Sequence, residues 1–396
     1  MEYNFTQKHK QYTFMLMGAG VVALLYALVA HIDGQRIWAN LLANTIFFLY
    51  ISIFGALFMA IQFAAEAGWS AGLKRVPEAM SQFIPVGGIF LLIILACCAL
   101  NLNHLYHWMD NSLFDPASDN YDKIIAGKKA FLNKPFFFFR TFVYLGTYIA
   151  FTRVFRKRSM EEDLHYAGAP LLKKNMNMSG WFLVCFAVFS STAAWDWVLS
   201  IDTHWFSTLF GWYNFATLFV SGFAAVTLFT IHLKRNGYFQ HINENHLHDL
   251  GKFMFAFSIF WTYLWFAQFM LIWYANIPEE VTYFMDRWEN YKFLFFFNLC
   301  VNFIIPLIVL MSRDAKRNLG TLAFVASAIF IGHWIDIFLM IMPGTVKERW
   351  GFGPLEILMF LGFLGIFIFV VLTALTKAAL VAKNHPFLVE SEHHHI

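Results

Sequence analysis

The sequence predicts an all-α integral membrane protein with about ten transmembrane helices, arranged as two four-helix bundles and two flanking helices. Of the 396 residues, 59% are hydrophobic and only 13% are charged, whereas soluble domains are about 45–50% apolar and about 25% charged. The apolar residues fall into long runs, and a bilayer core accepts the backbone only as helices or closed barrels. We therefore expect residues 1–396 to form a single polytopic membrane domain.

The apolar runs are each about 20 residues long or longer, which is the length that a helix needs to cross the hydrocarbon core. A very short turn at 202–204 predicts that the fifth and sixth spans form a tight antiparallel hairpin. The predicted spans, in chain order, are residues 13–32, 39–66, 82–103, 135–155, 180–202, 207–233, 250–275, 289–312, 318–343 and 354–382.

The distribution of positive charge predicts the orientation of these spans. Cytoplasmic loops of membrane proteins carry an excess of Lys and Arg. Most of the 28 Lys and Arg residues, including the cluster RVFRKR at 153–158, lie on the same side as both chain ends. We therefore expect both termini to be cytoplasmic, with residues 104–134 as an outer loop and residues 383–396 as a cytoplasmic tail.

A weak internal repeat relates the fourth and fifth spans to the eighth and ninth. The fourth span opens with phenylalanines followed by Arg140, and the eighth opens with phenylalanines followed by Asn298. The fifth span carries Asp196 and the ninth carries Asp336. An offset of four helices preserves the membrane orientation, so the repeat would be parallel. Chance similarity between Phe-rich segments is the alternative. The predicted repeat halves are about 39–202 and 207–343, with the first and tenth spans outside them.

Ionisable residues within the spans are the main functional signal. Asp196 lies in Trp-Asp-Trp, while His333 and Asp336 lie three residues apart on one helical face. A charge at membrane depth costs at least about 2.5–3.5 kcal/mol, and such residues mark ion or proton pathways. We hypothesise that two polar half-paths meet here. Asp336 or His333 would accept a proton, and Asp196 would relay it.

A structural role for these charges is the competing interpretation. Buried charges are usually paired, and Arg140 in the fourth span is close enough in depth to neutralise Asp196. Indole donors such as Trp195 are further candidates. For Arg140 itself, the role of counter-ion and the role of ligand both remain open.

Metal and nucleic-acid binding are not predicted. The four cysteines lie within apolar spans without Cys-x-x-Cys or Cys/His ligand spacing, which indicates small buried hydrophobic residues. A bis-histidine haem needs facing histidines at matched depth, and His333 is the one histidine well inside a predicted span. A net charge of +3 without a basic stripe is not typical of nucleic-acid binding.

Several motifs together carry a family resemblance. They are SIDTHWFSTLFGWY at 200–213, HDLGK at 248–252, WYANIPEE at 273–280, GHWID at 332–336, and the tail from HPFL at 385–388 to the histidines at 393–395. In combination they resemble the membrane subunits of bacterial alternative complex III, which belong to the polysulfide-reductase (NrfD-like) anchor family. The resemblance extends over nearly the whole chain. The combination of motifs is specific, although no single motif is.

The resemblance implies a place in a respiratory complex of the bacterial inner membrane. Such a complex oxidises menaquinol or ubiquinol and passes electrons to a cytochrome c or a terminal oxidase. This chain would hold no redox centre, no covalent cofactor and no metal, and would not be an enzyme alone. The expected partners are a paralogous NrfD-like membrane subunit, an iron–sulfur subunit, haem c subunits, small membrane subunits, lipids and a terminal oxidase.

The resemblance also implies where function would reside. The family's proton paths correspond to Asp196, His333 and Asp336, and its quinol site near the outer surface corresponds to Asp202 and His204, with Arg140 beside it. The paralogous subunit is the alternative quinol binder. A scaffold that docks partner subunits, and an autonomous transporter, are the other functions that the sequence leaves open.

Overall fold

The computed structural model describes residues 2–164 and 168–395. Helices make up 79% of the chain, so the predicted all-α fold is confirmed. The long helices are α1 (Gln7–Val29), α2 (Gly34–Ala64), α4 (Ile84–Ala99), α6 (Lys134–Leu164), α7 (Gly168–Trp197), α8 (Leu209–Arg235), α9 (Glu244–Ala275), α14 (Leu319–Val346) and α15 (Pro354–Leu375). The shorter ones are α3 (Arg75–Met80), α5 (Lys123–Gly127), α10 (Pro278–Asn290), α11 (Lys292–Leu299), α12 (Ile305–Val309), α13 (Arg313–Arg317) and α16 (Leu388–Glu392).

The described residues contain nine helical segments that are long and apolar enough to cross a membrane, so the chain is a multi-pass membrane protein. These segments correspond to nine of the ten predicted spans. The fourth predicted span, 135–155, coincides with the 31-residue helix α6, which is not among the nine. Arg140 and the basic run at 153–158 make α6 less apolar than its neighbours.

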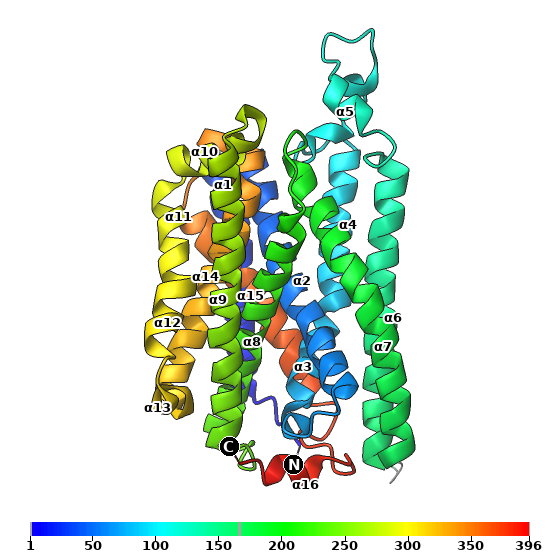
Figure 1. The fold of residues 1–396 in the computed structure, drawn as a ribbon, viewed down its shortest axis with the longest axis vertical. Coiled ribbons are helices and arrows are strands. Elements are labelled where there is room, and N and C mark those ends of the chain that lie inside the picture. Colours follow the sequence, from blue (N-terminus) through cyan, green and yellow to red (C-terminus); the bar gives the residue numbers. More distant parts are fainter. Residues whose placement is uncertain (1, 165–167, 396) are drawn as a thin grey trace.

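The long helices run side by side, with both chain termini at one end of the molecule and α5 at the other (Figure 1). We call these the terminus end and the loop end. The helices α2, α8 and α14 are enclosed by the others, because most of their apolar windows are buried. By contrast, α1 packs mainly on α15 and buries few residues. Side chains on the inner faces of α8 and α14 therefore lie in the interior of the protein.

The neighbours of each helix fall into two sets. In the first half of the chain α2 packs on α4 and α7, and α6 packs on α4 and α7. In the second half α8 packs on α9 and α14, α11 packs on α14, and α12 packs on both α14 and α9. The two sets meet where α2 contacts α8 and α14 and where α7 contacts α8. The predicted hairpin of the fifth and sixth spans corresponds to this contact of α7 with α8. The division into two bundles stays a prediction.

Several predicted boundaries are wrong; the fifth span, for example, was expected to begin at 180, whereas α7 begins at Gly168. The tenth span was expected to reach residue 382, but α15 ends at Leu375, because the amides of Thr376 and Lys377 turn back to carbonyls of α15. The fourth span was expected to end at 155, but α6 continues to Leu164. Glu162 and Asp163 in this extension pair with Lys74 and Arg75, which stabilises the helix beyond its apolar run.

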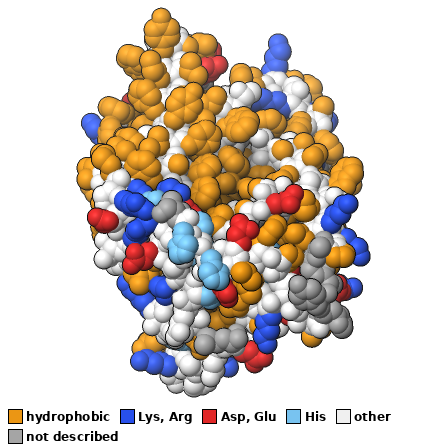
Figure 2. All heavy atoms as spheres, turned by 60° about the horizontal axis from the view of Figure 1, so that its bottom comes forward, with side chains coloured by type: hydrophobic (Ala, Val, Ile, Leu, Met, Phe, Trp, Pro, Cys, Tyr) orange, Lys and Arg blue, Asp and Glu red, His pale blue; other side chains and the backbone are white. Residues whose placement is uncertain are grey.

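The C-terminal tail folds across the terminus end. The Ser391 hydroxyl donates to the Trp69 carbonyl at 2.8 Å and accepts from the Gly72 amide at 3.1 Å. His394 Nε2 lies 2.7 Å from Asp249 Oδ2 on α9. Figure 2 shows this end of the molecule, where histidine and charged side chains lie below a mainly hydrophobic flank.

Candidate functional site

Asp336 on α14 is held by four hydrogen-bond donors from three neighbouring helices. The Thr217 hydroxyl on α8 donates at 2.7 Å, the Asn298 amide on α11 at 2.9 Å, and the Trp261 indole on α9 at 3.1 Å. The Tyr213 hydroxyl on α8 donates as well. The carboxyl is 1% exposed. Among the described residues, no lysine or arginine lies within ion-pair distance of it, so the site lacks a permanent counter-ion.

His333 lies one turn before Asp336 on the same face of α14. Its Nδ1 is 3.7 Å from Asp336 Oδ2. The ring is fully buried and makes a T-shaped contact with Trp261, with the ring centroids 5.4 Å apart. Neither ring nitrogen has a hydrogen-bond partner among the described residues. Buried polar groups are normally satisfied, and unsatisfied ones point to bound water or a functional role. Both ring nitrogens of His333 are thus available to a bound water or to a rearranged neighbour.

A π-helical turn shapes the helix that faces this pair. The segment Cys300–Ile304 joins α11 to α12 and contains Asn302, whose amide donates to Asn298 Oδ1 at 2.6 Å. Such turns are rare and often lie at functional sites. Gly332 makes room for this turn, because a Cβ on Gly332 would collide with the Asn302 amide oxygen. The two asparagines therefore form a polar strip that begins at Asp336.

Asp196 is neutralised by an ion pair. Arg140 Nε and Nη2 donate to its two carboxylate oxygens at 2.7 and 2.6 Å, and the Tyr144 hydroxyl donates at 3.1 Å. The guanidinium also donates to the Phe131 carbonyl and lies 3.9 Å from the centre of the Phe131 ring. Two-pronged pairs of this kind are strong and geometrically fixed. Asp196 is also the penultimate residue of α7, so it lies near the loop end rather than in mid-span.

The structure does not bring the predicted proton residues together as one group. His333 and Asp336 lie together, but Asp196 shares no hydrogen-bond partner with Asp336 among the described residues. Their surroundings nevertheless match. Arg140 and Asn298 each follow a run of phenylalanines, and each donates to the aspartate in its own half of the predicted repeat. One half has a cation at this position and the other a neutral amide.

Arg287 on α10 lies between Asp336 and the loop end. It is 3% exposed, and its guanidinium donates to the carbonyls of Tyr283, Leu339 and Met340 at 2.7, 3.0 and 3.3 Å. On its other side, Nη2 is 3.7 Å from Asp202 Oδ2. The sequence did not reveal Arg287 as a buried residue, because it lies between two predicted spans, where an exposed arginine is expected.

A small cavity connects Arg287 with Asp336. Its volume of about 20 Å³ is enough for one water. The cavity is polar on several sides, and the Gln268 amide nitrogen that lines it has no partner among the described residues. Its polar lining residues are Tyr213, Gln268, Tyr283, Arg287, Asn298 and Asp336. A bridging water there would have several hydrogen-bond partners.

A larger pocket of about 290 Å³ opens at the loop end and includes Asp202 in its lining. Lys128 also lines it and donates to the Thr203 carbonyl at 2.5 Å. Burial lowers the pKa of Lys128, and the nearby Asp122 opposes that shift. The Trp195 indole nitrogen at this pocket is buried and has no partner among the described residues. The pocket therefore offers an acceptor and two donors to a polar ligand.

The remaining predicted ligand, His204, does not line this pocket. Its Nε2 lies 2.6 Å from Asp122 Oδ2, and its side chain is 54% exposed. Asp122 in turn caps α5 by accepting from the amides of Ile124 and Ile125. The hydrogen bond from the Ile125 amide is the main cause that lowers the pKa of Asp122. The Ile124 amide and His204 lower it further. His204 thus fastens the 104–134 loop to the end of the fifth span.

Sequence analysis also missed a charged network at the terminus end. Glu78 is fully buried between Arg75 and Arg156, and it accepts from the Ser159 hydroxyl at 2.8 Å. These residues looked interfacial, because they lie just outside the predicted apolar runs. A further buried carboxylate, Glu356, accepts a two-pronged pair of bonds from Arg36 at 2.8 and 2.9 Å. That pair joins residues 320 positions apart, so no local signal predicts it.

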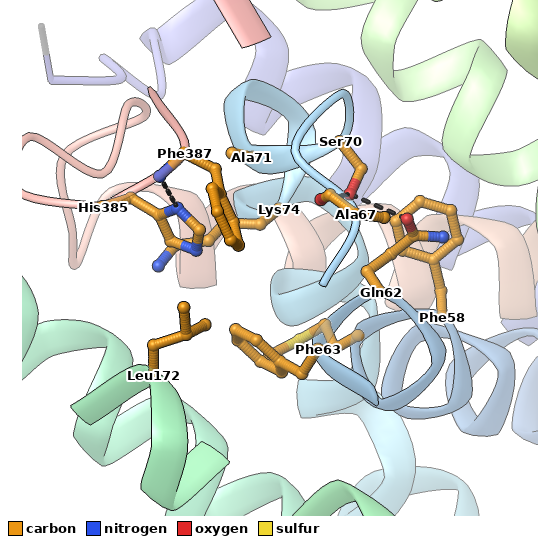
Figure 3. A pocket seen from close by; sticks show the side chains of 11 residues that line it. Phe58, Gln62, Phe63, Ala67, Ser70, Ala71, Lys74, Leu172, His385 and Phe387 are labelled. Carbon is orange, nitrogen blue, oxygen red and sulfur yellow. Dashed lines mark hydrogen bonds between the residues drawn. The ribbon is translucent and has the colours of Figure 1, made fainter. Parts of the chain in front are cut away.

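The tail contributes to a small pocket beside this network. Figure 3 shows His385 and Phe387 facing Phe63 and Leu172, with Lys74 behind. Burial, together with the charges of Lys74 and Arg75, lowers the pKa of His385 to about 3. The imidazole is thus neutral at physiological pH and serves as a packing and hydrogen-bonding group, with Nδ1 accepting from the Phe387 amide at 3.2 Å.

Metal-ligand geometry and relatives give no further guide. In the part of the chain that the structure describes, no three His, Cys, Asp or Glu side chains gather as metal ligands. No protein-family model matches the chain, and no curated protein matches it. The geometry around Asp336 is therefore the main guide to the function.

Proposed function

We propose that this chain is a membrane subunit that carries protons between the buried Asp336 and the loop end, within a quinol-oxidising respiratory complex. The observation that carries the proposal is the environment of Asp336: it is enclosed and hydrogen-bonded, it has no permanent counter-ion, and it lies beside an unsatisfied histidine. Burying an unpaired charge is costly, so such a carboxyl is suited to holding a proton.

His333 and Asp336 form a unit that moves one proton without changing its net charge. A protonated carboxyl beside a neutral imidazole carries the same total charge as a carboxylate beside an imidazolium. The Trp261 and Asn298 nitrogens can only donate. The hydroxyls of Tyr213 and Thr217 can also accept, and could thus receive the carboxyl proton. All four groups donate hydrogen bonds to the carboxylate form of Asp336 and stabilise it. The two hydroxyls can also accept a hydrogen bond from the protonated form.

The proposed route to the loop end runs through Arg287. A proton leaves Asp336 through a water in the 20 Å³ cavity. Arg287 is permanently charged, so it does not carry the proton; it orients the water and holds Asp202 on the other side. Asp202 then exchanges the proton with the 290 Å³ pocket. In this route Asp196 is a structural ion pair and does not relay protons.

The loop-end pocket is the proposed place for a quinol headgroup. Asp202 would accept a phenolic proton, while Trp195 and Lys128 would donate to the oxygens. Oxidation of a quinol to a quinone releases two protons and two electrons. Asp202 passes these protons on to the loop end, as it does the proton that arrives from Asp336, and the electrons pass to iron–sulfur or haem c centres in partner subunits. Menaquinol and ubiquinol both fit this chemistry.

The finer topology follows from the same proposal. Helix α6 is the tenth span, and the two sets of neighbouring helices are two four-helix bundles. The loop end faces outward, and the basic terminus end faces the cytoplasm. The proposed family is the NrfD-like anchor family of alternative complex III, with a paralogous membrane subunit, small membrane subunits and a terminal oxidase as further partners.

A scaffold function is the second candidate, favoured by the closed ion pairs. Arg140 with Asp196, and Arg75 and Arg156 with Glu78 and Asp163, are fully compensated and fix helices to each other. In a pure scaffold, the hydrogen bonds of Asp336 would likewise serve only to fix helices to each other. The exposed aromatic side chains on α9 and α11, such as Trp273 and Phe293, would then dock partner helices.

The two candidates are separated by paired substitutions in the purified complex. Asp336→Asn keeps the size of the side chain but removes the exchangeable proton, and Asp249→Asn, at the terminus end, is the matched control. The proton-path proposal expects quinol oxidation and proton release to fall in Asp336→Asn while the complex stays assembled. Full turnover of an assembled Asp336→Asn complex would favour the scaffold.

A further inference from the structure

A groove of about 470 Å³ lies between α8, α14 and α15, away from the proton route. Most of its lining is apolar. The contribution of α15 is the face that runs from Phe360 to Leu372. Two of the described residues that line it are polar, His232 and Ser327. Ile331 on its wall is 46% exposed, so the groove is open at the side of the protein. An apolar groove at this depth opens toward lipid.

The groove is elongated along the membrane normal. Residues 360–372 span about 18 Å of helix at about 1.5 Å per residue. One leaflet contributes about half of the roughly 30 Å hydrocarbon core. The groove starts near the ends of α8 and α15 at the terminus end, where Arg235 and Leu375 lie. Its length therefore matches a single hydrocarbon chain in the leaflet nearer the termini.

Helix α1 packs through glycine contacts on α15, which forms one wall of the groove. A Cβ on Gly20 would come within 3.0 Å of Gly362 Cα, and a Cβ on Gly365 would come within 2.8 Å of Leu16. This close approach brings the start of α1 to the end of α8, where the rings of His9 and His232 meet at 5.4 Å. His9 Nδ1 is buried and has no partner among the described residues.

The mouth of the groove is cationic. Neither α1 nor α8 carries an acidic residue, whereas α1 begins with Lys8 and Lys10 and α8 ends with Lys234 and Arg235. Lys10 follows His9 in α1, and its ammonium lies over the Phe5 ring at 5.7 Å. Phe5 packs on Phe369 of α15 at 5.9 Å, next to the groove-lining Ile368. Polar hydrogen-bonding groups and positive charge thus lie at one end of an apolar groove.

We propose that this groove binds one acyl chain of an anionic phospholipid, with the phosphate at the mouth beside Lys10, His9 and His232. The cationic mouth is the reason for choosing a phosphate headgroup over a neutral quinone ring. A basic residue near an anionic lipid headgroup contributes about 1 kcal/mol, a factor of about five in binding. The site is independent of the proton route, since it shares no residue with the Asp336 cavity or the loop-end pocket.

The test measures lipid retention by native mass spectrometry of the full chain in its complex. The protein is reconstituted in vesicles of equal parts phosphatidylglycerol and phosphatidylcholine, then extracted. We expect phosphatidylglycerol to be retained about fivefold or more over phosphatidylcholine. Lys10→Gln should remove about fivefold of this preference, whereas Lys173→Gln, an exposed lysine on α7, which does not line the groove, should leave it unchanged.

A second variant tests the groove itself. Ser327→Phe fills the groove and should abolish retention, whereas Val188→Phe, on the exposed face of α7, should not. Equal retention of the two lipids, or retention that is insensitive to both Lys10→Gln and Ser327→Phe, would overturn the proposal. Recovery of a quinone or a partner helix in the groove would overturn it too.

Discussion

The Asn298 amide donates to Asp336 at 2.9 Å in the position where, in the other half of the predicted repeat, the Arg140 guanidinium donates to Asp196. This difference separates two buried carboxylates that look alike in the sequence. Asp196 has a permanent counter-ion, and a two-pronged one. Asp336 has neutral donors and a histidine at 3.7 Å. In our account this single replacement of a cation by an amide turns a structural pair into a proton site.

Placing an arginine at position 298 should therefore stop proton exchange at Asp336. In Asn298→Arg the guanidinium would pair permanently with Asp336, as Arg140 does with Asp196. We expect proton release by the assembled complex to fall by about 10²-fold or more, the contribution that acid–base groups usually make. Proton release is followed with a pH-sensitive dye during quinol oxidation. Asn298→Gln, which adds no charge, should retain most of the activity. Wild-type proton release in Asn298→Arg would refute the assignment.

Removing the existing cation should instead affect stability. Arg140→Leu leaves Asp196 buried without a counter-ion, and breaking such a pair costs about 3–5 kcal/mol. We expect a lower thermal unfolding temperature of the purified protein in detergent. Replacing both partners, Arg140→Leu with Asp196→Leu, should recover most of the loss, because no charge stays unpaired. If the single variant unfolds at the wild-type temperature, the pair does not stabilise the fold.

Arg287 should control the exit of protons from Asp336. Arg287→Gln loses the bonds to the Leu339 and Met340 carbonyls and the charge beside Asp202. We expect kcat for quinol oxidation to fall by about tenfold, a loss of about 1.4 kcal/mol in transition-state stabilisation. The control is Arg349→Gln, which breaks an exposed pair with Asp33. Exposed pairs contribute about 0–1 kcal/mol, so it should change little. Equal effects of the two variants would argue against a specific route.

The 104–134 loop should loosen at acid pH. The pKa of Asp122 is lowered, so its carboxylate stabilises α5 at pH values above the ordinary aspartate pKa of about 3.9. That contribution is lost as the pH falls below this value and passes through the lowered pKa. Pepsin should therefore cut within 104–134 increasingly as the pH falls through this range.

A substitution tests the same contact at neutral pH. Asp122→Ala removes the cap of α5, which costs about 1 kcal/mol. Trypsin should then cut at Lys123 or Lys128 faster than in the wild type. Asp119→Asn, at an exposed aspartate of the same loop, is the control. Equal cleavage rates in Asp122→Ala and Asp119→Asn would show that the cap does not hold the loop.

The parts of the site that local spacing determines were predictable from the sequence. The three-residue separation of His333 and Asp336 places them on one helical face, and the structure has them 3.7 Å apart. The pair of Arg140 with Asp196 was one of two interpretations of a buried aspartate near an arginine. The apolar runs predicted the positions of the long helices, because burial in lipid requires continuous hydrophobic sequence.

The remaining parts depend on contacts that the sequence does not reveal. Tyr213 and Thr217 are two of several polar residues in a mainly apolar span, and only the packing of α8 on α14 turns them toward Asp336. Arg287 was hidden because α10 lies between two spans. Glu356 lies far along the chain from its partner Arg36. The π-helical turn at Asn302 depends on the fit of that helix against Gly332.

The most direct test of the central claim, that Asp336 exchanges a proton and Asp196 does not, is infrared difference spectroscopy of the complex during quinol oxidation. A carboxyl that gains or loses a proton changes its carbonyl stretching band. We predict a band that disappears in Asp336→Asn and persists in an assembled Asp196→Asn complex. A band that is insensitive to Asp336→Asn, or that is lost only in Asp196→Asn, would contradict the account.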